Sequence, residues 1–228
     1  MLQQVDTQLF YWVNRHHNAV LDTLLWTLSQ SWSWAVVLGL VLLCFVGGNV
    51  RFASRRAVHQ SGAPDTLIDA SSATSDSRFR LWRAVVVLVL GVVLCFLLSD
   101  RISVVCFKNV FCRLRPCHAL DDVRMYRTSC GGLYGFVSSH AANVFSLALF
   151  LSLFYRRLPC SPRRGLVAFL LFAWAFGVGY SRPYLGKHYP GDVFCGALLG
   201  LLVGAVVYVG LFFLYRGIFY KHWRRIRS

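Results

Sequence analysis

The sequence predicts an all-α integral membrane protein, a bundle of about five to six transmembrane helices with an N-terminal interfacial helix. The composition supports this fold class, because 57% of the 228 residues are hydrophobic and only 14% are charged. Soluble domains average about 25% charged residues. The mean hydropathy is +0.54, and the apolar residues gather in long runs. The length fits a single domain, 1–228.

Five apolar runs supply the main spans, at residues 31–47, 82–99, 138–155, 165–181 and 192–215. Several runs are shorter than the roughly 20 residues that cross a bilayer, so we expect polar neighbours to extend them. In the preceding region 1–30, residues 1–18 are not expected to be a signal peptide, because they lack a basic start and carry Asp6. We expect an amphipathic helix on the membrane surface there. Residues 19–30 fit either a second interfacial helix or the start of the first span.

The distribution of lysine and arginine orients the bundle, because cytoplasmic loops are enriched in both. We therefore assign the loop 48–81, expected to be flexible, and the basic tail 216–228 to the cytoplasm. The loop 100–137 then faces outward, although it is also basic. A bilayer with anionic lipids, together with an anionic substrate, accounts for the net charge of +15. A nucleic acid partner is not expected, since no basic patch lies on a soluble domain.

Two polar clusters flank the outward loop, each near the end of an expected helix. Lys108 and Arg115 are seven residues apart and would share a helix face, although Pro116 disfavours a helix through Arg115. In the second cluster, Ser138 or Ser139 can cap the following helix. The N-terminus of such a helix favours anions, and His140 would lie in its first turn.

A third polar cluster joins the last two apolar runs. Ser181 and Arg182 close one run, and Pro190 fits the first turn of the next helix. Asp192 lies in that turn, four residues after His188. A carboxylate beside one imidazole nitrogen fixes the tautomer and leaves the other nitrogen free to attack.

Each cluster alone also fits a structural role, as snorkelling cations, a capped helix or a buried histidine–aspartate pair. All three, however, fall on the same expected side of the membrane, each at a helix end. Ionisable groups at membrane depth are functional by default. Cations and backbone amides suit a phosphoryl group. A histidine oriented by a carboxylate suits covalent catalysis, and a second histidine suits proton transfer to a leaving group.

These residues resemble the type-2 phosphatidic acid phosphatase (PAP2) superfamily over residues 80–215. The family signature has three parts, K-x6-RP, PSGH and SR-x5-H-x3-D. The first part is matched by Lys108, Arg115 and Pro116, and the third by Ser181, Arg182, His188 and Asp192. The second part is matched in part, because Val137 replaces proline and Ser139 replaces glycine.

The resemblance implies a PAP2-type bundle and a role for each motif residue. His188 would be the nucleophile, Asp192 would orient it, and His140 would protonate the leaving oxygen and later activate water. The phosphate would be bound by Lys108, Arg115 and Arg182, with Ser138, Ser139 and Ser181 nearby. No metal and no other cofactor is expected, because the cations supply the charge stabilisation.

The resemblance also implies a membrane lipid as the substrate. The layout is similar to bacterial undecaprenyl pyrophosphate phosphatases, which rank first, followed by lipid A phosphatases and phosphatidylglycerophosphate phosphatases. The location expected is the bacterial inner membrane, with the active site in the outward loop on the periplasmic face. Rival interpretations are an anionic lipid transporter, an inactive protein with this fold and a vanadate-dependent haloperoxidase. The sequence does not indicate an oligomeric state.

The eight cysteines form no metal motif. Cys117 and Cys130 both lie in the outward loop, where an oxidising compartment allows them to pair. Cys112 is a competing partner. A bond between Cys117 and Cys130 would rigidify the loop beside the site.

Overall fold

The computed structural model describes residues 1–44, 67–157 and 164–224, and these ranges are almost entirely helical. The elements are α1 (Leu2–Arg15), α2 (Ala19–Ser29), a helix at Ser31–Cys44, α4 (Leu67–Ile102), η1 (Ser103–Lys108), α5 (Asn109–Phe111), α6 (Pro116–Ala119), α7 (Ser139–Arg156), α8 (Arg164–Tyr184) and α9 (Pro190–Arg224). The described ranges contain no strand, only an isolated bridge between Leu114 and Tyr134.

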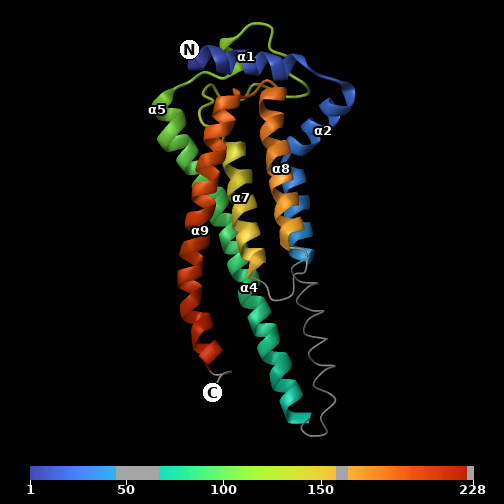
Figure 1. Ribbon diagram of the computed structural model, residues 1–228, viewed down its shortest axis with the longest axis vertical. Coiled ribbons are helices and arrows are strands. Elements are labelled where there is room, and N and C mark those ends of the chain that lie inside the picture. The colour runs from blue at the N-terminus through green and yellow to red at the C-terminus, as the bar shows by residue number, and fades with distance from the viewer. Residues whose placement is uncertain (45–66, 158–163, 225–228) are drawn as a thin grey trace.

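The long helices run side by side, and α1 lies across one end of the bundle (Figure 1). Helix α7 occupies the centre and packs against α4, α8 and α9. The described C-terminal end of α9 lies at the opposite end from α1 (Figure 1). This arrangement confirms the all-α bundle with an N-terminal helix at one end.

Among the described residues, three helices are long and apolar enough to cross a membrane, Leu81–Phe111, Arg164–Tyr184 and Pro190–Leu214. A fourth candidate is the pair Ala19–Ser29 and Ser31–Cys44, which is bent by 69°. Helix α7 corresponds to the expected span 138–155 and is buried along most of its length. Because α7 faces protein rather than lipid, it tolerates polar residues such as Asn143.

The two helices that carry the site begin where the sequence predicts. Ser138 is the N-cap of α7, and its Oγ accepts a hydrogen bond from the Ala141 amide. Helix α9 begins at Pro190, and Asp192 lies in its first turn. Both helix N-termini are therefore fixed by local sequence, and both point toward the α1 end (Figure 1).

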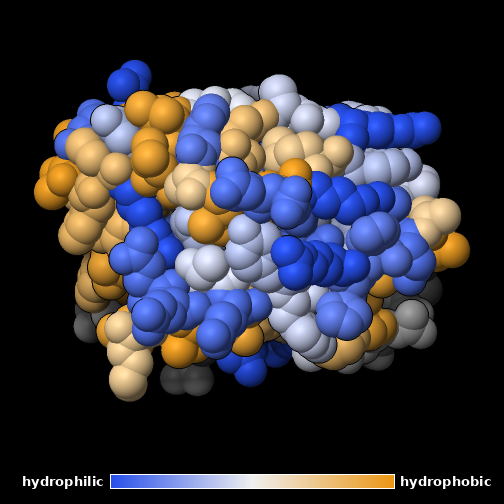
Figure 2. Space-filling view, turned by 90° about the horizontal axis from the view of Figure 1, so that it is seen from above, coloured by the Kyte–Doolittle hydropathy of each residue, from blue (hydrophilic) through white to orange (hydrophobic). Residues whose placement is uncertain are grey.

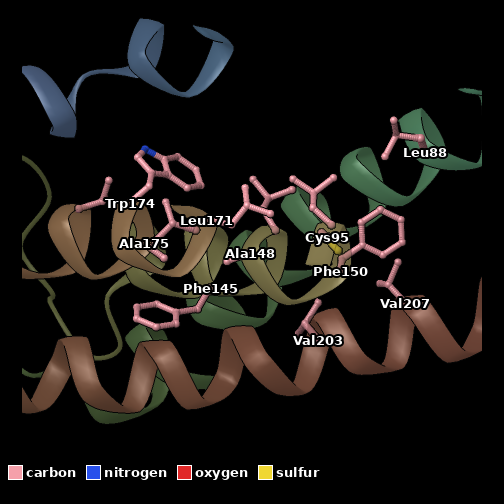
Figure 3. Packing of buried hydrophobic residues seen from close by; sticks show 14 of the residues in the cluster. Leu88, Cys95, Phe145, Ala148, Phe150, Leu171, Trp174, Ala175, Val203 and Val207 are labelled. Atoms are coloured by element: carbon pink, nitrogen blue, oxygen red, sulfur yellow. The ribbon is translucent and has the colours of Figure 1, made fainter. Parts of the chain in front are cut away.

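Glycines hold α9 against α7. A Cβ atom at Gly196, Gly200 or Gly204 would collide with a backbone oxygen of α7. The four-residue spacing of these glycines therefore serves close helix packing. In the buried cluster, Phe145 of α7 lies on the side toward α9, and Phe150 lies beside Cys95 of α4 and near Val207 of α9 (Figure 3). The packed core gives the site a rigid base.

Three boundaries differ from the sequence prediction. Within the expected flexible loop 48–81, residues from 67 onward belong to α4, and residues 45–66 lie outside the described ranges. No glycine or proline occurs between Pro64 and Gly91, so nothing interrupts the helix that extends from the apolar run. The expected loop 100–137 is also shorter, because α4, η1 and α5 continue the helix to Phe111.

In the expected tail 216–228, too, the helix is longer than predicted. Helix α9 continues to Arg224, and residues 225–228 lie outside the described ranges.

Candidate active site

The three polar clusters meet at the end of the bundle that α1 covers. Hydrophilic side chains gather on the surface of this end (Figure 2). The Ser138 amide donates to the Asp192 carbonyl at 3.0 Å, which joins the N-termini of α7 and α9. The second and third clusters are thus in direct contact.

Lys108 lies at the end of η1 and reaches the N-terminus of α7. Its Nζ donates to Ser139 Oγ at 2.6 Å, and Ser103 Oγ lies 2.6 Å from the same hydroxyl. The first and second clusters are therefore joined through Ser139, the residue that replaces the glycine of the family signature. Both Lys108 and Ser139 belong to the site that the sequence predicts.

Arg115 does not share a helix face with Lys108, so that expectation is wrong. The helix ends at Phe111, and Cys112 takes a left-handed conformation with φ of 46°. Arg115 instead precedes α6 in extended backbone. Its Nε donates to the Tyr134 carbonyl and its Nη1 to the Cys130 carbonyl, each at 3.3 Å.

The loop that holds Arg115 is cross-linked by a disulfide. Cys117 and Cys130 form this bond, with their Cα atoms 5.9 Å apart, and Cys112 is a free thiol. Because Cys130 also accepts from Arg115, the bond fixes the segment that positions this guanidinium. His118 lies close to both cysteine sulfurs, but a disulfide leaves those thiols unable to ligate a metal.

His188 and Asp192 form the centre of the site. His188 lies in the turn between α8 and α9 and is 1% exposed. Its Nδ1 is 3.5 Å from Asp192 Oδ2, which also accepts from the Tyr189 amide at 3.1 Å. Gly135 packs against both groups, since a Cβ there would lie 3.1 Å from Asp192 Oδ2 and 3.5 Å from His188 Nδ1.

The surroundings of His188 keep its imidazole neutral. Burial lowers its pKa well below the ordinary value, and the nearby cations Arg115, Arg182 and Lys108 lower it further. The Nδ1 atom lies 3.5 Å from the carboxylate of Asp192 but forms no hydrogen bond among the described residues. The structure therefore places a neutral, buried imidazole beside a carboxylate and three cations.

Arg182 is a buried cation, only 2% exposed, on the last turn of α8. Its Nε has no hydrogen-bond partner among the described residues. The neighbouring Ser181 donates its hydroxyl to the Val178 carbonyl at 2.6 Å, so the structure shows only an intrahelical contact for this serine. Ser138 likewise caps α7, and contact of either hydroxyl with phosphate stays a prediction.

A fourth cation, Lys187, adds to this positive region. It is half-buried, and burial lowers its pKa to about 8, with further contributions from Arg182 and Arg115. His140, in the first turn of α7, interacts electrostatically with Arg182, His188 and Lys187. Its ring packs edge-on against Trp34, with centroids 5.5 Å apart. The second histidine therefore faces the same positive region as the first.

Sequence reasoning missed two residues of the site. Arg113 donates from Nη1 to Asp192 Oδ1 and from Nη2 to Asp6 Oδ2, both at 2.7 Å. Asp6 comes from α1 and also accepts from the Gly191 amide at 2.7 Å. The sequence contains only a weak signal for this contact. Arg113 occupies an unspecified position of K-x6-RP, and Asp6 is the only acid among the first 18 residues.

Comparison with known proteins decides the family. The PAP2 superfamily profile matches residues 80–216, more than half of the chain and all three clusters. The chain belongs to the PAP2 superfamily. It is accordingly a phosphate ester hydrolase, a membrane lipid phosphatase of the PAP2 type.

Individual PAP2 relatives agree with this assignment. A lipid A 4'-phosphatase of Porphyromonas gingivalis is 28% identical over 208 residues, which cover 90% of this chain and 72% of that protein. A lipid A 4'-phosphatase of Bacteroides thetaiotaomicron is 35% identical over 131 residues, covering 56% of this chain and 55% of that protein. The crystal structure of Aquifex aeolicus LpxE has the same fold, with a TM-score of 0.54 at 20% identity, covering 88% of this chain and 93% of that chain.

Proposed function

We propose that this PAP2 protein removes a phosphate from a lipid A-type glycolipid through a phosphohistidine at His188, without a metal ion. One observation carries the proposal. Four cations gather around the two buried histidines, His188 and His140, and none of them forms an ion pair with a carboxylate among the described residues. These cations are Lys108, Arg115, Arg182 and Lys187. A phosphate is the anion that such a site lacks.

The reaction has two steps. In the first, the bound phosphate anion offsets the nearby cations and favours a protonated His140. The lone pair on His188 Nε2 then forms a bond to phosphorus, the bond from phosphorus to the lipid oxygen breaks, and His140 donates its proton to that oxygen. In the second, a water molecule gives a proton to His140 and attacks phosphorus, and the bond to His188 breaks. The products are the dephosphorylated lipid and inorganic phosphate, and both histidines return to their starting state.

The cations stabilise charge on the phosphoryl oxygens in both steps. Arg182 and the amides at the N-terminus of α7 need no rearrangement to do so, because both are held rigidly by the helices. Asp192 keeps the Nδ1 proton of His188 in place and so maintains the tautomer that attacks.

The choice of lipid A rests on the relatives, since two of them are named lipid A 4'-phosphatases and one covers 90% of this chain. Undecaprenyl pyrophosphate, which the sequence favours, is a second candidate. A diphosphate carries more negative charge than a monoester, and the fourth cation, Lys187, gives the site charge to match it.

We propose that the site faces the periplasm and that the C-terminus lies in the cytoplasm. The disulfide between Cys117 and Cys130 supports this orientation, because such bonds persist in oxidising compartments. The basic tail at the opposite end of the bundle also supports it.

The test is phosphate release by the purified protein in detergent with EDTA. The substrates are lipid A, undecaprenyl diphosphate and monophosphate, phosphatidylglycerophosphate and phosphatidic acid, each assayed beside His188→Ala. We expect release from lipid A that survives EDTA and is lost in the variant. Faster phosphate release from undecaprenyl diphosphate than from lipid A would make undecaprenyl diphosphate the preferred substrate and leave the proposed mechanism unchanged. Release that EDTA abolishes, or that persists in His188→Ala, would contradict the mechanism, and no release from any lipid would favour a transporter.

A further inference from the structure

Arg113 is placed so that it does not bind substrate. One terminal nitrogen donates to Asp192 and the other to Asp6, each at 2.7 Å. The guanidinium also lies over the Tyr189 ring, 4.0 Å from its centroid. Both terminal nitrogens and one face of this cation are therefore occupied by the protein.

The contact on Asp192 leaves the other carboxylate oxygen for the nucleophile. Arg113 binds Oδ1, whereas Oδ2 faces His188 Nδ1 and accepts from the Tyr189 amide. Asp192 is fully buried, so its orientation is set by these partners rather than by water. Loss of Arg113 would free the carboxylate to rotate away from His188.

Asp6 fixes Arg113 from the N-terminal helix. Its Oδ2 accepts from Arg113 and its Oδ1 from the Gly191 amide, at the start of α9. A Cβ at Gly191 would lie 2.8 Å from Asp6 Oδ2, so the close approach requires glycine. Phe10 anchors α1 one turn further on, since it is fully buried and its ring lies 5.7 Å from the Tyr189 ring.

We infer that Arg113 and Asp6 are positioning residues, and that α1 belongs to the active site because it holds the pair of His188 and Asp192 in register. The inference rests on the proposed function, in which His188 is the nucleophile. Asp6 acts on Arg113, Arg113 acts on Asp192, and Asp192 orients His188. The three contacts join α1, the outward loop and α9, which are far apart in sequence.

The test compares Arg113→Gln, Arg113→Lys and Asp6→Asn with the unchanged protein, by kcat, KM and thermal stability on the best lipid. Partners that orient a reactive group typically contribute about 10- to 100-fold to activity. We expect Arg113→Gln to lower kcat by about that factor with KM nearly constant. Lysine can reach one carboxylate but not both, so Arg113→Lys should recover part of kcat. Asp6→Asn should cost less, because its amide oxygen can still accept from Gly191.

The chain supplies a matched control in Arg124, which lies in the same loop and pairs with Asp22 of α2 at 2.6 and 2.9 Å. Arg124→Gln removes a comparable ion pair that does not contact Asp192. It should lower thermal stability with kcat nearly unchanged. Thr7→Ala is the control for Asp6, because this hydroxyl donates to the Gln3 carbonyl within α1.

The outcomes separate the inference from the proposed function. A rise in KM at constant kcat in Arg113→Gln would mean that Arg113 binds substrate, and equal loss of kcat in Arg124→Gln would mean a structural role only. Either result would overturn the inference. If Arg113→Gln fails to fold, Asp6→Asn decides, because it removes one charge and keeps the acceptor. Full activity in His188→Ala would instead refute the proposed function.

Discussion

The two sides of the His188–Asp192 pair differ in how their charges are balanced. On the α1 side, Arg113 is matched by two carboxylates, Asp192 and Asp6. On the opposite side, Arg182 is buried with no carboxylate partner in the described part of the chain, and Arg115 is held by backbone carbonyls. The α1 side pairs its one cation within the protein, with one negative charge in excess, and needs no anion. The opposite, unbalanced side has cations in excess, which supports the proposal that the phosphate binds there.

The largest expected effect comes from removing one arginine from each side. Arg182→Leu should lower kcat/KM by about 100- to 1,000-fold, because a preorganised charge in a buried site is lost. It should also leave thermal stability unchanged or raised, since an unpaired buried cation disappears. Activity assays and thermal unfolding of the detergent-solubilised protein measure both.

The matched variant is Arg113→Leu, which leaves Asp192 and Asp6 buried without their cation. We expect it to lower the free energy of unfolding by about 1–3 kcal/mol. This is less than for a fully buried ion pair, because solvent screens the partly exposed Arg113. If both leucine variants changed stability in the same direction, the distinction between the two sides would be wrong.

The dependence of KM on pH should follow the titration of Lys187, one of the cations on the unbalanced side. Burial lowers the pKa of Lys187 to about 8, so this side chain is charged below that pH and loses its charge above it. KM should therefore rise as pH increases through about 8. Lys187→Arg should move this alkaline limb to higher pH, because arginine stays protonated.

The acid side of the same profile depends on His188. Its pKa lies well below the ordinary value, so the neutral nucleophile persists as pH falls below about 6.5. Kinetics between mild acid and mild alkali test both limbs. An alkaline limb that does not move in Lys187→Arg would remove Lys187 from the site.

Much of this site could be predicted from sequence because its parts are local. Ser181, Arg182, His188 and Asp192 lie within one helix end, one turn and the next helix start, so their spacing determines their proximity. The relation between Lys108 and Arg115 could not be predicted, because it depends on the left-handed conformation of Cys112, which ends the helix.

The contact between Asp6 and Arg113 spans 107 residues and follows no periodic pattern. It arises because α1 folds back across the end of the bundle (Figure 1). Sequence periodicity does not show which residues of the bundle α1 will contact. The bundle itself was predictable from apolar runs, whereas the extension of α4 to residue 67 was not. The first residues of α4 are mostly polar and show no helical apolar period.

A smaller effect is expected away from the His188–Asp192 pair, at the glycines Gly196, Gly200 and Gly204 through which α9 packs against α7. Gly200→Ala would drive a Cβ into the Ala142 carbonyl of α7 and should lower stability by about 1–3 kcal/mol. At temperatures where the variant is folded, kcat should stay near that of the unchanged protein. A large loss of kcat in the folded variant would show that the site is sensitive to any change in helix packing.

The smallest effect should come from the disulfide. Replacing Cys117 and Cys130 by serine together loosens the segment whose carbonyl accepts from Arg115. We expect a few-fold rise in KM with little change in kcat. An unchanged KM would show that the Tyr134 carbonyl and the bridge to Leu114 hold Arg115 without the bond.

The central claim, that the unbalanced cations hold a phosphoryl group while His188 attacks it, can be tested by trapping the intermediate. The protein is mixed with excess lipid substrate, quenched rapidly under alkaline conditions and digested for mass spectrometry. The account predicts one added phosphoryl group on the peptide containing His188, lost on mild acid treatment and absent in His188→Ala. A phosphoryl group on His140, or turnover by the unchanged protein with no phosphorylated peptide at any quench time, would contradict it.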